Sequence, residues 1–173
     1  MVFTDASSAI LLYRAGLFSR LTRAFSIVFA SSVFDELTRP GYVGVMAFKQ
    51  AVDKKQVAVR TQADPEVLTA WPGLQALDPG EKETLCLFLE TRQGFILTDD
   101  GKAARLCHRL ELPFINALLV PRIFYFAGIL DEQESKTHMK NLGRSGRYSK
   151  KILTIADGLD RKDLNPFRQG IKQ

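Results

Sequence analysis

The stretch FILTDDGKAARLCHRLELPFIN, residues 95–116, decides the fold of this chain. FILT is a short β-rich apolar run that predicts a buried strand, and PFIN predicts a second short strand. Between them, residues 101–112 carry apolar side chains at helical spacing. A strand, a helix and a strand in this order are typical of a parallel sheet. Asp99 and Asp100 therefore stand side by side at the carboxyl end of a buried strand.

The rest of the chain alternates in the same way. Further strands are predicted at residues 1–4, 25–30 and 57–60, and helices at 7–16, 31–39, 43–56, 78–93, 117–128, 131–143 and 147–159. Ser7, Ser31 and Asp78 are the expected N-caps, Glu81 completes a capping box, and Gly94 ends its helix. Thr61–Ala76 is expected to be irregular around one short helix. This pattern predicts an α/β fold with a central, mostly parallel sheet between two helical layers.

Composition and charge indicate an ordinary globular domain with a basic extension. Apolar residues make up 46% of the chain and charged residues 25%. We expect a cytoplasmic protein without a membrane span, with Cys86 and Cys107 as reduced core residues. Residues 135–173 hold ten Lys or Arg against three Asp, whereas residues 1–134 are slightly acidic. We therefore divide the chain into a domain at 1–134 and a basic helical arm at 135–173, which suits a polyanion or an acidic partner.

Acidic residues fall where the predicted sheet presents its carboxyl edge. Asp5 follows the first strand, the Asp99–Asp100 pair follows a later one, and Glu36 lies in the helix after residues 25–30. Glu81 shares the apolar face of its helix, while Glu83 points elsewhere and is the weaker candidate. Carboxylates gathered at one edge repel each other unless a cation binds. A donor set of oxygens without Cys or His favours Mg²⁺ or Mn²⁺.

Each acid also has an ordinary structural interpretation. Asp5 can cap a helix, Glu36 can be solvated, Glu81 can belong only to a capping box, and Asp99–Asp100 can form a turn. Their order along the chain, relative to the strands, is more specific than any one of them. His108 and His138 are expected to be structural or surface residues.

Four segments resemble the PIN-domain nucleases, specifically a toxin-like branch with GExE and TDD motifs. They are FTDASSAILLYRAGLF, SSVFDEL, LDPGEKETLCLFLE and GFILTDDGKAARLCHRLELPF, in the family's order over about residues 2–115. The resemblance implies a three-layer α/β/α PIN-like fold and a Mg²⁺- or Mn²⁺-dependent ribonuclease acting on single-stranded RNA. Many such proteins are toxins of toxin–antitoxin pairs, so an antitoxin and a homodimer are candidate partners.

The same resemblance assigns roles to residues of this chain. Asp5, Glu36, Glu81 and Asp100 would be the catalytic, metal-binding acids, with Asp99 replacing or assisting Asp100. Ser7, Glu83 and Asn116 would be supporting residues. From the charge pattern, we expect Arg144, Arg147, Lys150 and Lys151 to hold RNA phosphates and Tyr148 to stack a base.

Two alternative functions belong to other classes of protein. The segment FINALLVP lacks the Gly or Thr residues common in the family and the additional acid of some members, which suggests an RNA- or protein-binding module with a degenerate metal site and no catalysis. A phosphatase-like hydrolase using Asp5 has less support, because Ser7 stands where the second Asp would be needed.

Overall fold

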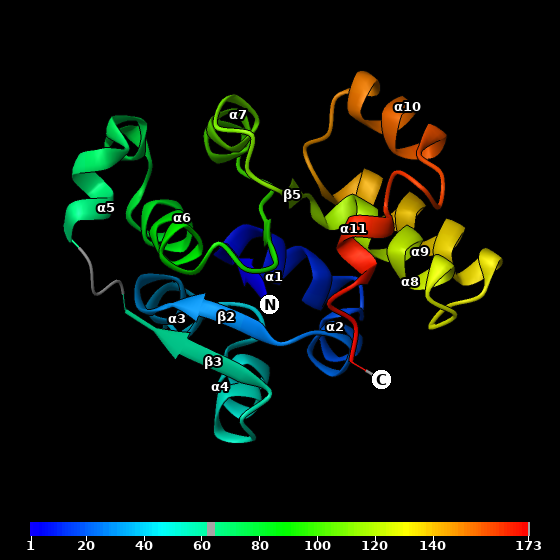
Figure 1. Cartoon of the computed structure of the whole chain (residues 1–173). Helices are drawn as coiled ribbons and strands as arrows, with labels where there is room; N and C mark the ends of the chain where they lie inside the picture. The colour runs from blue at the N-terminus through cyan, green and yellow to red at the C-terminus, as the bar shows by residue number, and fades with distance from the viewer. Residues whose placement is uncertain (62–64, 173) are drawn as a thin grey trace.

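The computed structural model describes residues 1–61 and 65–172, and these residues contain one five-stranded sheet (Figure 1). Its strands are β1 (Val2–Thr4), β2 (Ile27–Ala30), β3 (Val57–Arg60), β4 (Phe95–Leu97) and β5 (Phe114–Ile115). Their order is β3-β2-β1-β4-β5, and each neighbouring pair is parallel. The predicted three-layer α/β/α fold is therefore confirmed.

Helices connect the strands and extend beyond the last one. They are α1 (Ala6–Arg14), α2 (Phe18–Ala24), α3 (Ser31–Leu37), α4 (Val45–Asp53), α5 (Pro65–Ala70), η1 (Pro72–Ala76), α6 (Pro79–Thr91), α7 (Gly101–Arg109), η2 (Ala117–Leu119), α8 (Val120–Phe126), α9 (Glu132–Ser145), α10 (Lys150–Gly158) and α11 (Asn165–Arg168). Neither α2 nor α11 was predicted, since helices this short show little apolar periodicity. Part of the stretch predicted to be irregular, residues 62–64, lies outside the described residues.

The strand order places a topological switch beside β1. From β1 the chain builds β2 and β3 on one side, and β4 and β5 then extend the sheet on the other side. In open parallel sheets, a crevice forms outside the carboxyl ends of the strands where the order reverses. Here that position is the junction of β1 and β4, which the predicted acidic residues follow.

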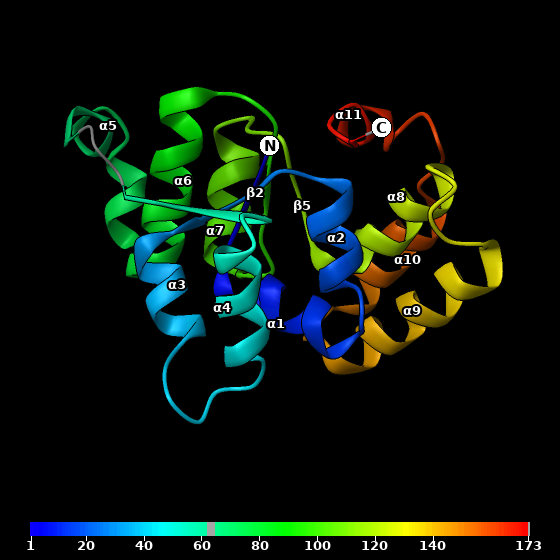
Figure 2. The ribbon, with the colours of Figure 1, turned by 90° about the horizontal axis from the view of Figure 1, so that it is seen from below.

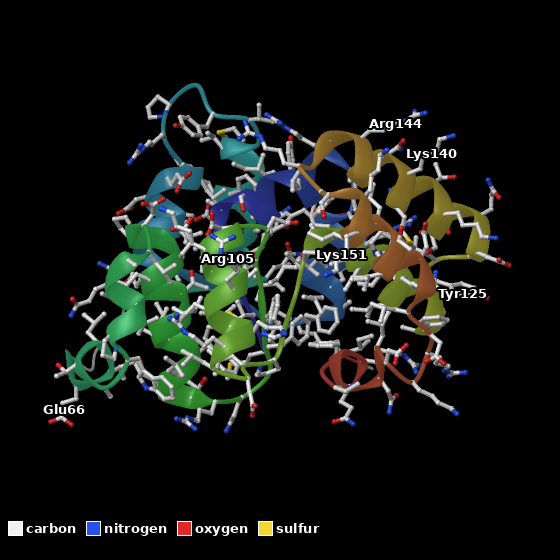
Figure 3. The ribbon with its side chains drawn as sticks, turned by 90° about the horizontal axis from the view of Figure 1, so that it is seen from above. Glu66, Arg105, Tyr125, Lys140, Arg144 and Lys151 are labelled. Carbon is white, nitrogen blue, oxygen red and sulfur yellow. The ribbon has the colours of Figure 1, made fainter. Side chains whose placement is uncertain are left out.

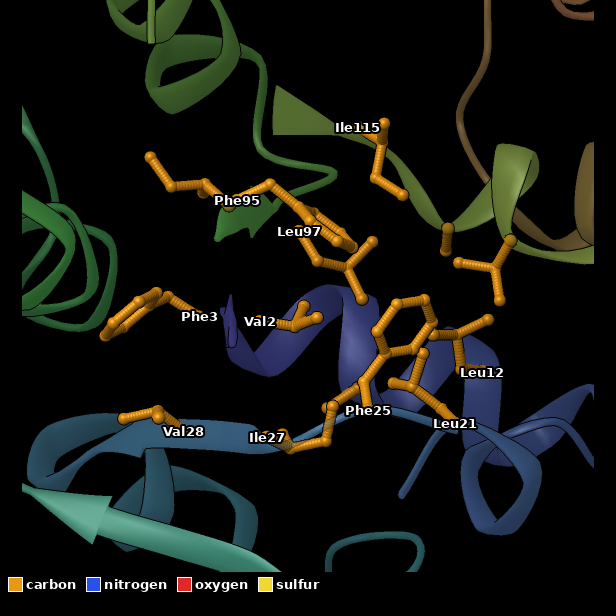
Figure 4. Packing of buried hydrophobic residues seen from close by; sticks show 14 of the residues in the cluster. Val2, Phe3, Leu12, Leu21, Phe25, Ile27, Val28, Phe95, Leu97 and Ile115 are labelled. Atoms are coloured by element: carbon orange, nitrogen blue, oxygen red, sulfur yellow. The ribbon is translucent and has the colours of Figure 1, made fainter. Parts of the chain in front are cut away.

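Side chains alternate across the strands and form a core on each face of the sheet. Phe3 of β1 packs edge-on against Phe88 of α6, with ring centroids 5.8 Å apart. Phe29 of β2 faces the opposite helical layer, where its ring packs with those of Phe18 and Phe48. Figure 4 shows the neighbouring buried cluster around Phe25, between the strands and helix α1. The sheet is thus buried on both faces, as its near-continuous apolar strands predict.

The predicted caps of α1 and α6 are wrong in detail. The N-cap of α1 is Asp5, not Ser7, and an Asp5 carboxylate oxygen accepts the Ser8 backbone N–H at 2.7 Å. Asp78 precedes α6 without accepting a side-chain cap hydrogen bond, so the predicted capping box is not formed. Glu81, in the first turn of α6, therefore does not pair with Asp78 in a capping box, and it hydrogen-bonds to its own backbone instead.

The start of α3 also differs from the prediction. Its N-cap is Ala30, and no side chain of α3 itself closes the first turn. Instead Glu83 of α6 accepts the Ser32 backbone N–H at 2.9 Å and the Ser31 hydroxyl at 2.9 Å. A carboxylate from another helix is favourable at a helix N-terminus, where backbone N–H groups lack partners. This contact fixes α3 against α6.

The basic C-terminal residues pack on the domain. Helix α9 runs across the predicted boundary between residues 134 and 135 and lies against α8 (Figure 2). Met139 and Leu142 of α9 are buried, and Phe167 packs edge-on against Phe95 of β4. Within the described part of the chain, no helix combines the length and apolar character needed to cross a membrane.

Candidate active site

Separate chain segments bring carboxylates to the carboxyl edge of the sheet. Asp5 follows β1, and Asp99 and Asp100 follow β4, which pairs with β1 in parallel. The Asp5 backbone N–H donates to the Leu97 carbonyl oxygen at 3.2 Å, so the two strand ends are joined. The edge expected from the sequence therefore exists, and it lies at the topological switch.

Asp5 is buried and held by three hydrogen bonds. Its Oδ1 accepts the Ser8 backbone N–H at 2.7 Å and the Ser7 hydroxyl at 3.0 Å. Its Oδ2 accepts the Thr98 hydroxyl at 2.6 Å. Ser7 thus makes the contact that a polar support would make, while Ser8 and Thr98 were not anticipated. A carboxylate has about four acceptor positions, so Asp5 retains capacity for one more partner.

Asp99 is the organising residue of the edge. Its Oδ2 accepts the Ser8 hydroxyl at 2.7 Å and the Ala117 backbone N–H at 3.0 Å, and its Oδ1 accepts the Tyr148 hydroxyl. Burial, and to a smaller extent the charge of Asp5, raise the pKa of Asp99 to about 6, although these hydrogen bonds act in the opposite direction. Asp99 therefore joins α1, η2 and the α9–α10 connection to the end of β4.

Asp100 uses only one of its two carboxylate oxygens in hydrogen bonds, whereas Asp99 uses both. Its Oδ1 caps α7 by accepting the backbone N–H groups of Lys102 at 2.7 Å and Ala103 at 2.8 Å. Its Oδ2 accepts no hydrogen bond from any residue that the structure describes. Of the two adjacent acids, Asp100 is therefore the one with an oxygen available to a ligand.

Glu81 connects α6 electrostatically to the same edge. It lies half-buried in the first turn of α6. Burial is the main reason that its pKa is raised to about 6, and the negative charges of Asp100, Asp78 and Asp5 add to the effect. The charges of the two strand-end acids, Asp100 and Asp5, therefore act on Glu81 from the neighbouring edge of the sheet.

Glu36 is brought towards this group by the contact between α3 and α6. A Cβ built on Gly80, the residue before Glu81, would lie 3.9 Å from Glu36 Oε2. The Glu83 hydrogen bonds to Ser31 and Ser32 hold α3 in that position. Glu83 itself is thus a positioning residue on a different face of α6.

Asn116 follows β5 and contributes an unusual feature to the edge. Its Oδ1 is buried and has no hydrogen-bond partner among the described residues. Buried acceptors are nearly always paired in folded proteins, because an unpaired one retains its desolvation penalty. An oxygen of this kind next to β4 is suited to water or a cation.

The predicted RNA-binding residues divide into two groups. Arg144, Arg147, Lys150 and Lys151 are exposed, and Figure 3 shows Arg144 and Lys151 on α9 and α10. Tyr148 was expected to stack a base, but it is half-buried and its hydroxyl donates to Asp99. Its structural role is therefore to anchor the basic connection at the acidic edge, a contact across 49 residues that no local sequence signal indicates.

The donors at this edge suit Mg²⁺ or Mn²⁺ in kind but are not gathered into a binding shell. Within residues 1–61 and 65–172, no three His, Cys, Asp or Glu side chains lie close enough to hold an ion together. However, the charges of Asp100, Asp78 and Asp5 add to the effect of burial in raising the pKa of Glu81, and Asn116 Oδ1 lacks a partner among the described residues. A hard cation would relieve both. The residues therefore fit a divalent ion chemically, provided that the side chains move towards it.

A parallel sheet with carboxylates at its switch point is typical of an α/β protein that binds its ligand at this edge. A family model described as a PIN domain matches residues 1–155, and the chain belongs to that family. PIN domains are generally nucleases, and the match extends into the predicted basic arm. A search of the curated proteins found no match.

The raised pKa values predict that the metal-free protein becomes less stable as pH rises through about 6. Glu81 and Asp99 hold their protons to higher pH when folded than when unfolded, so the folded state binds more protons below that pH. In EDTA, the free energy of unfolding at pH 5 should exceed that at pH 7.5 by about 1–2 kcal/mol, after allowance for solvent screening. Thermal unfolding would measure it. Glu81→Gln should flatten the dependence, and an unchanged slope would contradict this account.

Proposed function

We propose that the protein is a metal-dependent endoribonuclease that cleaves single-stranded RNA by phosphodiester hydrolysis. The observation that carries the proposal is the convergence of Asp5 and Asp100 at the joined carboxyl ends of β1 and β4, at the topological switch of the sheet. The charges of both acids also reach Glu81 of α6, where they add to the effect of burial on its pKa. Membership in the PIN-domain family supports it independently.

In this proposal the role of each acidic residue follows from its surroundings. Asp5 is held by hydrogen bonds at the centre of the edge, and Asp100 is oriented as the cap of α7. Glu81 and Glu36 approach from α6 and α3 and are only partly buried, so they can close on an ion. Mg²⁺ or Mn²⁺ bound there would neutralise charge on the phosphodiester and activate water for attack at phosphorus.

Other residues support the acids or bind the substrate. Asp99, linked to Ser8, Ala117 and Tyr148, keeps the strand ends and the basic connection in register. The exposed cations at Arg144, Arg147, Lys150 and Lys151 offer attraction to RNA phosphates that weakens with salt.

The test is cleavage of a mixed-sequence single-stranded RNA by the purified protein in Mn²⁺, in Mg²⁺ and in EDTA. We expect cleavage in the metals only, and its loss in Asp100→Asn, because Asn keeps the helix cap but loses the charge. Either metal should also raise the melting temperature, as ligands of the folded state do. Cleavage that persists in EDTA, or in the variant, would contradict the mechanism.

A second candidate function is an RNA- or protein-binding module without catalysis. The arrangement of the described acids favours it, since no three of them lie close enough to hold an ion together. Absence of both cleavage and a metal-induced rise in melting temperature would select this alternative. A rise without cleavage would instead indicate a working site that requires a particular RNA.

We also propose a cytoplasmic toxin of a toxin–antitoxin pair, on the strength of the four motif segments in the sequence. An antitoxin or a second copy would need exposed apolar surface. Phe124 is buried and Tyr125 is only 37% exposed, so α8 offers little, whereas Met46 at the start of α4 is 67% exposed. Co-expression with the product of an adjoining small gene, followed by purification, would test the pairing.

A further inference from the structure

A cavity of about 240 Å³ lies between η1 and α7 and is not used by the acidic edge. Its lining includes three cationic side chains and three apolar or small ones, which are Lys102, Arg105, Arg109, Gly73, Leu77 and Leu106. A water molecule takes about 30 Å³ of liquid volume, so the space suits a group of several heavy atoms.

The three cations form one face of α7. Lys102, Arg105 and Arg109 are spaced by three and four residues, which places them next to one another along the helix. No acidic side chain lines the cavity. The ion pairs Arg20–Glu134 and Lys136–Glu132 involve none of these three cations. The positive charge of the cavity is therefore uncompensated, which calls for an anion.

The kind of anion follows from the side chains. Arginine presents a planar fork of N–H donors that matches phosphate, and two arginines with a lysine can neutralise more than one negative charge. Leu77 and Leu106 add an apolar wall beside the cations. This combination suits a phosphate attached to an organic group better than a small inorganic ion.

The cavity lies close to the acidic edge. Helix α7 begins at Gly101, directly after Asp100, and the Lys102 backbone N–H donates to Asp100. Arg105 folds back along the helix, since a Cβ built on Gly101 would lie 3.3 Å from its Nη1. At 1.5 Å of rise per residue, Arg105 and Gly101 are about 6 Å apart along the axis. Figure 3 shows Arg105 on the face of the molecule that also carries Lys151.

We propose that this cavity binds a phosphate of the RNA strand that flanks the phosphodiester at the acidic edge. The inference rests on the proposed ribonuclease function and adds a substrate-positioning site to it. Arg105 and Arg109 hold the flanking phosphate, so the strand is fixed on one side of the edge by α7 and on the other by the basic α9–α10 connection.

The first test measures binding rather than cleavage. Fluorescence anisotropy of a labelled single-stranded RNA in EDTA gives the Kd at several salt concentrations. Arg105→Ala/Arg109→Ala should weaken binding about tenfold or more and, because one phosphate contact is lost, reduce the slope of log K against log salt by about 0.7. The matched control is Lys49→Ala/Lys54→Ala, which changes one residue of α4 and its C-cap residue. Figure 1 places α4 on the opposite side of the sheet from α7. Equal weakening by both pairs would overturn the proposal.

A variant that preserves the net charge distinguishes specific binding in the cavity from attraction by the overall positive charge of the protein. Gly73 approaches α7 so closely that a Cβ there would lie 2.6 Å from Arg109 Nη2 and 2.8 Å from Leu106 Cδ1. Gly73→Ala should displace Arg109 and weaken RNA binding severalfold at unchanged net charge and similar melting temperature. Unchanged affinity in this variant would count against a specific site.

Inorganic phosphate distinguishes an RNA phosphate from a free one. We expect phosphate to compete with RNA better than chloride at equal ionic strength, and to lose this advantage in Arg105→Ala/Arg109→Ala. If phosphate raises the melting temperature through these arginines while RNA affinity is unaffected by their loss, the site takes free phosphate and the proposal fails. Because RNA binding is measured in EDTA, its outcome does not depend on whether the cleavage assay succeeds or fails.

Discussion

Replacing Asp5 with Asn should reduce RNA cleavage by about a thousandfold while leaving the chain folded. Asn keeps an oxygen where Oδ1 accepts the Ser8 N–H, so the cap of α1 survives. At the other oxygen, the Thr98 hydroxyl can rotate to accept from the new amide. What is lost is the negative charge at the centre of the edge, which attracts the cation.

The matched control is Asp35→Asn, which removes an exposed carboxylate from α3 one residue before Glu36. Its cleavage rate should stay within about twofold of the parent, because an exposed charge at a distance is screened. Both variants should melt within a few degrees of the parent protein. If Asp5→Asn retains its activity under these conditions, Asp5 does not hold the ion and the proposed centre is misplaced.

The fold could be predicted because each of its strands and most of its helices produce a recognisable local pattern in the sequence. Each strand is a short apolar run, and the helices between them repeat apolar residues at helical spacing. Alternation of the two already implies a parallel sheet, and a parallel sheet brings all carboxyl strand ends to one edge. The placement of Asp5 beside Asp99 and Asp100 needed nothing more than this.

The roles of the acids within the edge could not be predicted in the same way. Sequence reasoning left Asp99 and Asp100 as alternatives, and the structure separates them through partners that are remote in the chain. The Ser8 hydroxyl that binds Asp99 is 91 residues away, and the Tyr148 hydroxyl is 49 residues away. Hydrogen bonds between distant segments depend on tertiary packing, which propensity and periodicity do not encode.

The prediction of the helix caps was wrong for a related reason. Local rules expect the nearest Ser or Asp to cap a helix. The N-terminus of α3 is instead capped by Glu83 of α6, which follows Ser32 by 51 residues in the chain. The basic face of α7 was also overlooked, although Lys102, Arg105 and Arg109 recur at helical spacing. That spacing alone also describes a solvated helix surface, and only the cavity against η1 gives it a different meaning.

Gly94→Ala should have the largest effect on stability of any change considered for this chain, at about 4 kcal/mol or more. Gly94 has φ +88°, and a Cβ there would lie 1.9 Å from the Met1 carbonyl oxygen and 2.7 Å from the Met1 carbonyl carbon. That oxygen accepts the Phe95 backbone N–H at 3.1 Å, where β4 begins to pair with β1. Since both colliding groups are backbone, relief requires the central strand pair to separate.

Gly128→Ala is the matched control, because it tests the same backbone conformation without the collision. Gly128 has φ +73°, and a Cβ there would meet nothing within 4 Å. Its cost should be the left-handed conformation alone, about 1 kcal/mol, or roughly 3 °C in melting temperature for a chain of this size. Gly94→Ala should lower the melting temperature by about 10 °C or more. Equal losses in the two variants would show that the contact between Met1 and Gly94 does not constrain the sheet, and the junction of β1 and β4 would then be looser than the acidic edge requires.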